Sequence, residues 1–413
     1  MAAAVIDKYL RNRAAHTPWL LEGCDTRDFR AAVVLPALAE EESLPQTLAA
    51  LAQNPAILLD GLLVVVVVNN RSDATTKEKA ENRRTLDWLA TNPYPQLHLS
   101  WIDVASPGLE LPPKDGVGLA RKIGFDLALP LLDWEKAPLL ISLDADTLVD
   151  DNYLPAIFAH FESSNRGGAT LPFRHQPGKT EVQETAIRHY ELYLRSYLHG
   201  LQFAGSPYAY HAIGSAIACR ATAYVAVGGM NRRAAGEDFY FLQQLTKTSG
   251  VEMLRGTLVR PSARTSQRVP FGTGRAVQAS AAESKALYRF ISLRAFEILR
   301  DWLSLVSENC DRSGETLLAQ AFDLSPVLGE FLETRDFVAC WRKIKRNNPP
   351  TRLVPAWHNW FDGLRTRQLL HRLMENLPAR EPEELVEELL AAGGWCGRKD
   401  RTDQLALLEE LQG

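Results

Sequence analysis

Two carboxylates stand one residue apart, Asp144 and Asp146, directly after the apolar run Leu139 to Leu143. An apolar run of this kind is typical of a strand buried in a sheet. Open α/β sheets bind their ligands at the carboxyl ends of such strands. We therefore predict a metal and substrate site at Asp144 and Asp146. The plainer alternative is that the two acids only form a turn and cap the next helix.

A second acidic pair, Glu237 and Asp238, follows the glycine-rich stretch Gly228 to Gly236. The pair opens an apolar-periodic segment that reaches Thr248 and is typical of a helix. At a helix N-terminus the dipole favours negative charge, so we expect both carboxylates to be ionised. The same dipole would favour two acids here without any chemical role, and that alternative stays open.

The elements that must position these acids alternate between strand and helix. Pro36 is expected to end the first strand, and Ser43 to cap the helix that follows, with Pro45 in its first turn. Further helices are expected up to about Ala90 and from Gly116 to Leu129. The predicted strands are Ala31–Leu35, Leu62–Val68, Leu97–Ile102 and Leu139–Leu143.

This alternation predicts an α/β fold, a mostly parallel sheet with helices on both faces. The loops after the first, second and fourth strands then share one edge of the sheet. Besides the two strand-end acids, that edge collects a polar rim suited to a ribose, a base or a divalent ion: Glu40, Asn69, Asn70 and Asp73.

The remainder of the chain changes character at about Ala276. Before that point the expected elements are helices at 151–162, 180–202 and 237–248 and strands at 169–172 and 214–220. After it, the chain is predicted to form successive amphipathic helices, at 284–307, 317–333, 337–345, 357–377 and 383–392. We therefore predict a lead-in over residues 1–30, an α/β domain over 31–275 and an all-α C-terminal domain over 276–413.

The composition limits the function classes. Lys and Arg together number 46 against 50 Asp and Glu, so the net charge does not indicate a nucleic-acid binder. Five widely spaced cysteines without a C-x-x-C pair argue against a disulfide framework or a zinc site. The N-terminus lacks the apolar core of a signal peptide, and Leu62–Val68 is too short to cross a bilayer. We expect a cytoplasmic protein with at most peripheral membrane contact.

Several motifs, in their order along the chain, resemble those of glycosyltransferase family 2. They are Val33-Val-Leu-Pro-Ala-Leu-Ala-Glu-Glu-Glu-Ser-Leu-Pro, Val67-Val-Asn-Asn-Arg-Ser-Asp, Gly118-Leu-Ala-Arg-Lys-Ile-Gly, Leu143-Asp-Ala-Asp-Thr, and Val227-Gly-Gly-Met with Gly236-Glu-Asp-Phe. The resemblance spans about residues 31–274. It implies a GT-A fold and transfer of a sugar from a nucleotide diphosphate sugar to an acceptor hydroxyl, with inversion at the anomeric carbon.

The resemblance also implies residue roles. Asp144 and Asp146 match the D-x-D motif that contacts the ribose and the Mg²⁺ or Mn²⁺ ion bridging the diphosphate. Asp238 matches the general base, and Glu237 beside it would position the acceptor. The residues expected to bind the nucleotide sugar are Pro36, Glu40, Asn70, Arg121, Asp144, His211, Arg264 and Arg268.

The sequence departs from the family pattern at two places. Asn69 and Asn70 replace a pair of acids, and Ala39 stands where Asn is usual. An amide donates as well as accepts, so the donor could carry uridine or guanosine. The Q-x-x-R-W motif of processive members is absent, and Arg264 and Arg268 occupy its region, which favours a single-addition enzyme.

Other interpretations of these residues stay open. His211 could be structural, Asn69 and Asn70 could be turn residues, and the two arginines could belong to a solvated loop. The aromatic and basic stretch from Trp357 to Arg372 could lie on a membrane, although core packing is the favoured interpretation. At the level of function the alternatives are a nucleotidyltransferase, a retaining GT-A transferase and a non-catalytic nucleotide-sugar binder. The acceptor could be a glycan, a small molecule or a lipid-linked compound.

Overall fold

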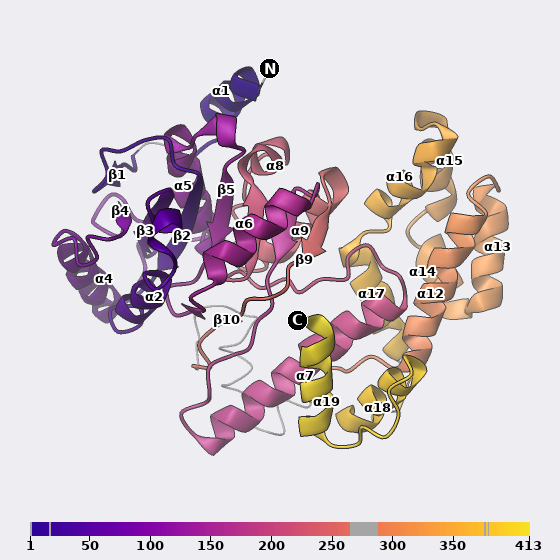
Figure 1. Ribbon diagram of the computed structural model, residues 1–413. Helices are drawn as coiled ribbons and strands as arrows, with labels where there is room; N and C mark the ends of the chain where they lie inside the picture. Colours follow the sequence, from indigo (N-terminus) through magenta and orange to yellow (C-terminus); the bar gives the residue numbers. More distant parts are fainter. Residues whose placement is uncertain (1, 16–17, 265–287, 376, 379) are drawn as a thin grey trace. The chain divides into compact units, whose positions relative to one another are not determined.

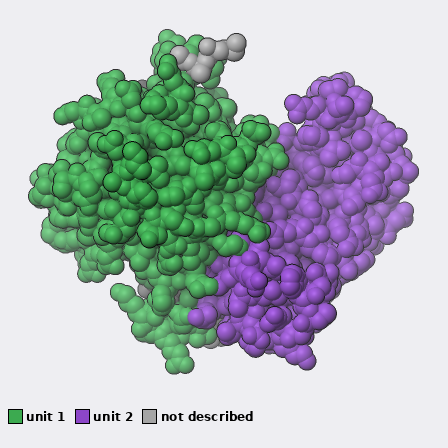
Figure 2. Space-filling model, in the orientation of Figure 1, with its two compact units in different colours: residues 1–187, 212–279, 413 green, residues 188–211, 280–412 purple. Residues whose placement is uncertain are grey.

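The computed structural model of the chain describes residues 2–15, 18–264, 288–375, 377–378 and 380–413. Arg268 and the predicted helix start at Ser284 lie outside these residues. The chain divides into two compact units (Figure 2). Unit 1 comprises residues 1–187, 212–279 and 413, and unit 2 comprises residues 188–211 and 280–412. The helix α7 (Glu181–Phe203) therefore begins in unit 1 and ends in unit 2.

Unit 1 is built around a large sheet, with strand order β1-β4-β3-β2-β5-β8-β7-β9. The neighbours β4, β3, β2 and β5 are parallel, as are β7 and β9, while β1 and β8 run antiparallel to their neighbours. The predicted mostly parallel α/β sheet is confirmed. The strands are β1 (Leu21–Glu22), β2 (Ala31–Ala37), β3 (Leu62–Asn69), β4 (His98–Val104), β5 (Leu139–Ser142), β7 (Gly168–Thr170), β8 (Ile217–Arg220) and β9 (Val251–Met253).

Pro36 does not end the first strand, because β2 continues to Ala37 and Pro36 pairs with Val67 of β3. The carbonyl of Val34 accepts from the N–H of Leu143 at 3.1 Å, so Val34 faces β5. The backbone of Pro36, two residues further on, is directed to the same side as that of Val34. The pairing of β2 with β5 has already ended there, because its last pair is Val34 with Ser142. A proline at this position removes no ladder hydrogen bond, which is why the strand tolerates it.

Helices flank the sheet of unit 1 (Figure 1). α5 packs on β2 and β3 because Gly124 has no side chain: a Cβ there would lie 2.4 Å from Val34 and 2.8 Å from Val67. A small two-stranded sheet pairs β6 (Leu148–Val149) with β10 (Val259–Arg260). The helices are α1 (Ala2–Asn12), α2 (Leu44–Leu51), α3 (Ala56–Leu59), α4 (Thr76–Leu89), α5 (Val117–Ala128), α6 (Tyr153–Ser163), α8 (Ala221–Ala226) and α9 (Glu237–Thr248).

Unit 2 is helical, as predicted for the C-terminal region, and is organised around fully buried Trp302, Trp341 and Trp357. Two predicted helices are each split in two, at Ser325 and at Asp362, where a side chain caps a new helix. The helices are α12 (Leu293–Glu308), α13 (Gly314–Leu324), α14 (Pro326–Glu333), α15 (Phe337–Asn347), α16 (Leu353–Trp360), α17 (Gly363–Met374), α18 (Pro382–Ala392) and α19 (Arg401–Gln412).

The buried position of Trp357 supports core packing over a membrane surface for this stretch. Within the described residues, every helix falls short of the length and apolar character that a bilayer crossing requires.

Candidate active site

The two strand-end acids lie on a loop that is held from both sides. Thr47 of α2 donates its hydroxyl to the carbonyl of Ala145 at 2.9 Å. The amide of Gln176 donates to the carbonyl of Asp146 at 2.9 Å and to that of Arg260 at 2.8 Å. The backbone of the loop is thus fixed, while the Asp144 side chain is 34% exposed and can meet a ligand.

Arg121 of α5 connects this loop to the second acidic pair. Its buried guanidinium donates Nη2 to Asp144 at 2.6 Å, Nε to Glu237 at 3.2 Å and Nη1 to the Ser142 hydroxyl at 2.6 Å. Burial alone would lower the pKa of Arg121, but the two carboxylates more than offset it and the pKa is raised. One permanently charged group therefore joins two acids that lie 93 residues apart in the chain (237 − 144).

The room for this guanidinium comes from a glycine. A Cβ on Gly214 would lie 2.3 Å from Nη2 of Arg121. The Ser142 hydroxyl in turn donates to the carbonyl of Gly214 at 2.6 Å. Neither residue was predicted from the sequence, and Ser142, the only polar residue in an otherwise apolar strand end, was the signal available.

Glu237 and Asp238 form the first turn of α9, after Gly236 in the left-handed conformation at φ 71°. Asn231 donates its side-chain amide to the carbonyl of Glu237 at 2.8 Å. Gly118 of α5 fits against the same loop, since a Cβ there would lie 2.4 Å from the carbonyl oxygen of Arg233. This close approach brings α5, and with it Arg121, against the start of α9.

The surroundings of the two acids act against the effect of the dipole. Burial raises the pKa of Glu237, and the charge of Asp144 adds a smaller rise, although Arg121 opposes both. Burial and the adjacent Glu237 carboxylate raise the pKa of Asp238 as well. For Asp238, burial and the repulsion of the adjacent acid thus outweigh the contacts that favour its ionised form.

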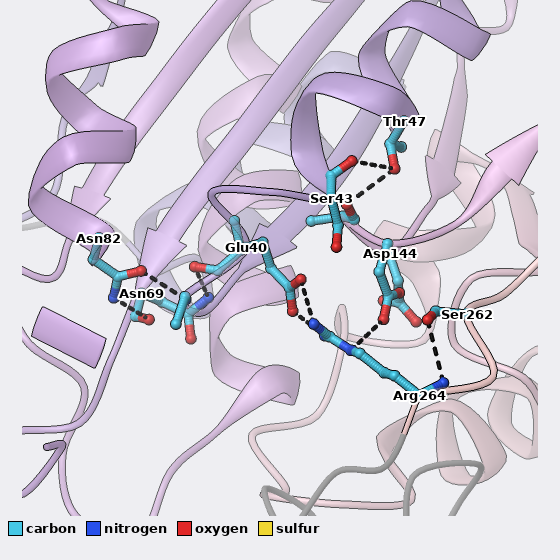
Figure 3. A network of polar contacts seen from close by, with 12 residues as sticks. Glu40, Ser43, Thr47, Asn69, Asn82, Asp144, Ser262 and Arg264 are labelled. Carbon is cyan, nitrogen blue, oxygen red and sulfur yellow. Dashed lines mark hydrogen bonds and ion pairs between the residues drawn. The ribbon is translucent and has the colours of Figure 1, made fainter. Parts of the chain in front are cut away.

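Arg264, in the loop after β10, lies between two carboxylates from different strand ends (Figure 3). It forms a bidentate pair with Glu40: Nη1 donates to Oε2 at 2.7 Å, and Nη2 donates to Oε1. Its Nε lies 3.0 Å from Oδ2 of Asp146. Burial would lower the pKa of Arg264, but Glu40 and Asp146 raise it overall. The structure thus brings together Glu40, Asp146 and Arg264, which the sequence had placed in one site.

Asn70, predicted to contact the base, is buried in a network of amide contacts. Its side chain is 1% exposed, and its amide donates to the carbonyls of Arg71 and Ala105. Its Oδ1 accepts from Asn82 at 2.8 Å, and Asn82 also donates to the carbonyl of Asn69. The asparagines hold the loop after β3 together, so the structure gives Asn70 a structural place. Pro36, also predicted to bind the donor, is buried within β2.

His211 is also predicted to bind the donor. It belongs to unit 2, is buried, and its Nε2 lies 3.1 Å from Oε1 of Gln412. Burial, together with the positive charge of Arg195, lowers the pKa of His211 to about 3, so the ring is neutral at physiological pH. The structural interpretation of this histidine fits its surroundings. Arg268 lies outside the described residues.

No protein-family model and no curated protein matches the sequence. Among solved structures, the chain is similar to S. aureus TarS 1-349 in complex with UDP-GlcNAc, with a TM-score of 0.40 and 12% identity over 92% of this chain and 91% of that chain. It is also similar to the mannosyltransferase PcManGT from Pyrobaculum calidifontis in complex with GDP-Man and Mn²⁺. There the TM-score is 0.38 and the identity 14%, over 100% of this chain and 97% of that chain.

Proposed function

We propose that this chain is a metal-dependent, inverting glycosyltransferase that moves a sugar from a nucleotide diphosphate sugar to an acceptor hydroxyl. The observation that carries the proposal is the bridge made by Arg121 between Asp144 and Glu237. It brings a strand-end acid suited to a donor and a helix-start acid pair suited to an acceptor into one connected group. The ordered motifs that resemble glycosyltransferase family 2 support the same assignment.

The donor set at Asp144 and Asp146 fits a hard divalent cation. Mg²⁺ is usually held by one or two carboxylates, with substrate phosphates and water completing its shell. Among the described residues, no group of three or more His, Cys, Asp or Glu side chains could hold an ion without such help. Asp146, with Asp144, would hold Mg²⁺ or Mn²⁺ together with the diphosphate. When bound, the ion would neutralise the charge that develops on the departing diphosphate.

Asp238 is the better candidate for the base. Glu237 is 4% exposed and accepts from Arg121, whereas Asp238 is half-buried and its Oδ1 accepts from the neighbouring N–H of Phe239 at 2.7 Å. In the proposed step, Asp238 takes the proton of the acceptor hydroxyl as that oxygen attacks the anomeric carbon. The bond from this carbon to the diphosphate oxygen breaks, and the electron pair leaves with the diphosphate. A base with a raised pKa is suited to this task near neutral pH.

The remaining residues support donor binding. Glu40 lies beside Arg264 at the edge of the sheet where the strands end. There the Glu40 carboxylate could accept a hydrogen bond from a ribose hydroxyl, and the Arg264 guanidinium could donate to a phosphate. Burial of the Asn70 amide leaves the choice between UDP and GDP sugars to other groups. The acceptor is proposed to be a glycan, small molecule or lipid-linked hydroxyl compound.

The test is a transfer assay with a panel of UDP and GDP sugars, Mn²⁺ and a mixed acceptor set. Asp238→Asn should bind nucleotide as the wild type does but transfer about 100-fold or more slowly. Asp146→Ala should weaken metal-dependent nucleotide binding. Asp87→Asn is the control, because Asp87 is an exposed acid paired with Arg83 on α4.

The outcomes separate the alternatives. Full transfer by Asp238→Asn would exclude Asp238 as the base, and a product that retains the donor's anomeric configuration would indicate a retaining enzyme. Nucleotide-sugar binding without transfer to any acceptor would favour the non-catalytic binder.

A further inference from the structure

Arg264 makes a contact that donor binding would have to change. Its guanidinium directs Nη1 and Nη2 to Glu40 and Nε to Asp146. Asp146 is the acid proposed to hold the divalent cation, and its side chain is 18% exposed. Figure 3 shows the guanidinium lying between the loop after β2 and the loop that carries Asp144. A positive charge thus already stands against the proposed metal ligand.

We infer that Arg264 is an exchangeable counter-ion of Glu40 and Asp146 that competes with the divalent cation for Asp146. The inference rests on the proposed function for the identity of the ligands. Glu40 and Asp146 are both poorly exposed carboxylates, so the protein stabilises them with a cation on site. A guanidinium and a divalent ion cannot share one carboxylate edge without strong mutual repulsion. We therefore expect an ion that binds at Asp146 to displace Arg264 from this carboxylate.

The exchange couples the metal to the nucleotide. A guanidinium displaced from two carboxylates needs another anion, and its planar donor fork matches phosphate as well as carboxylate. The diphosphate supplies that anion and also completes the shell of the metal ion. The cation should therefore bind weakly alone and much more tightly with the nucleotide. By linkage, the nucleotide should gain the same factor from the cation.

The test measures Mn²⁺ affinity by electron paramagnetic resonance of the free ion, with and without UDP or GDP. The full-length wild type is compared with Arg264→Gln and Arg264→Lys. Arg260→Gln is the control. Arg260 lies on β10, four residues before Arg264, and its guanidinium pairs with Asp150 and not with the proposed metal ligand. Thermal unfolding of each variant, with and without Mn²⁺ alone, shows that it is folded and gives a second measure of binding.

Without nucleotide, Arg264→Gln should bind Mn²⁺ about tenfold more tightly than the wild type and gain more thermal stability from the ion. With nucleotide, the advantage should vanish or reverse, so that the coupling factor falls by about tenfold or more. Arg264→Lys should lie between the two, and Arg260→Gln should match the wild type.

An unchanged or weaker nucleotide-free Mn²⁺ affinity in Arg264→Gln would overturn the inference, because an arginine that only clamps phosphate would not affect the ion alone. The proposed function fails separately, if the wild type neither binds nor transfers any nucleotide sugar. The nucleotide-free measurement decides the role of Arg264 in either case.

Discussion

Position 121 requires the shape of arginine as well as its charge. The guanidinium reaches Asp144, Glu237 and Ser142 through three different nitrogens, and a lysine ammonium cannot span partners spread in this way. Arg121→Lys should slow transfer about 100-fold, because the two acids lose their common spacing. Arg121→Gln should also lower the free energy of unfolding by roughly 3–5 kcal/mol, since it leaves poorly solvated carboxylates without a cation.

These effects are checked by steady-state kinetics and urea unfolding. Arg84→Gln is the control, because Arg84 pairs with Glu41 at an exposed position and its loss should change neither quantity much. Wild-type kinetics in Arg121→Lys would show that the positive charge alone suffices.

Asp238 should give the transfer rate an unusual pH dependence. A base must be deprotonated to accept a proton, and burial with the neighbouring Glu237 raises the pKa of Asp238. The rate should therefore fall as the pH drops through a value well above about 3.9, the ordinary value for an aspartate. The pH profile of kcat/KM checks this expectation. An acid limb at the ordinary aspartate value would contradict the raised pKa or the assignment of the base.

The Asp238 carboxylate should also lower the free energy of unfolding at higher pH. Folding disfavours its ionised form, so the wild type loses stability relative to the unfolded chain as the pH rises from the ordinary aspartate range through the raised pKa. Asp238→Asn removes this ionisation and should unfold at a higher Tm than the wild type at pH 8, with a smaller difference at pH 5. A change of about 1 kcal/mol corresponds to roughly 2–4 °C in a domain of this size. Equal Tm differences at both pH values would contradict the linkage.

At the scale of elements, the packing of α5 sets the distance between Arg121 and the start of α9. In Gly118→Ala the new Cβ would meet the carbonyl oxygens of Arg233 at 2.4 Å and Asn231 at 2.8 Å, which are backbone atoms that cannot rotate away. The loop should shift, with a destabilisation of about 1–3 kcal/mol and a fall in kcat larger than the change in donor KM. Gly61→Ala is the control, since its Cβ would meet only the Arg30 side chain at 3.6 Å. Kinetics and thermal unfolding of both variants check the prediction.

Elements with a strong local signal could be predicted from the sequence. The helix α9 has the predicted bounds, and the four central strands lie where apolar runs and polar loops placed them. β9 was missed because three residues carry no periodicity, and it exists through its pairing with β7. The sequence predicts only a lead-in over residues 1–30, yet this segment contains α1, where Tyr9 donates its hydroxyl to the buried Asp126 at 2.7 Å. That contact spans 117 residues, which no local pattern reveals.

In the candidate site, too, residues with a local sequence signal could be predicted, and those that depend on contacts between distant elements could not. Asp144, Asp146 and Glu40 follow strands, so the topology of a parallel sheet was enough to gather them. The asparagine at position 70 follows a strand too, but whether its amide faces a ligand or Asn82 depends on side-chain packing that the sequence does not specify. Gly214 matters only because a guanidinium from another element occupies the space beside it.

At the scale of the whole molecule, the two units do not divide the chain at a single point. The segment from Arg188 to His211 belongs to unit 2 although it lies between two parts of unit 1. Its apolar side chains are part of the helical cores: Leu201 belongs to the cluster that contains Trp302 and Trp357, and Leu192 to the cluster that contains Phe290. The composition changes only near residue 276, so a division based on composition cannot detect that residues 188–211 belong to unit 2.

A chain shortened to residues 1–275 should therefore behave poorly. The second half of α7 and the residue that follows it would lose the core that covers Leu192, Leu201 and Ala204, and an exposed apolar surface of this kind promotes aggregation. We expect the fragment to bind a hydrophobic dye strongly and to elute as aggregates in size-exclusion chromatography, whereas the full chain does neither. Replacing the three residues with Ser, Gln or Asn in the fragment should restore part of its solubility, while the same changes in the full chain should destabilise it. A soluble fragment that unfolds cooperatively and binds no dye would show that residues 188–211 fold well without the C-terminal helices.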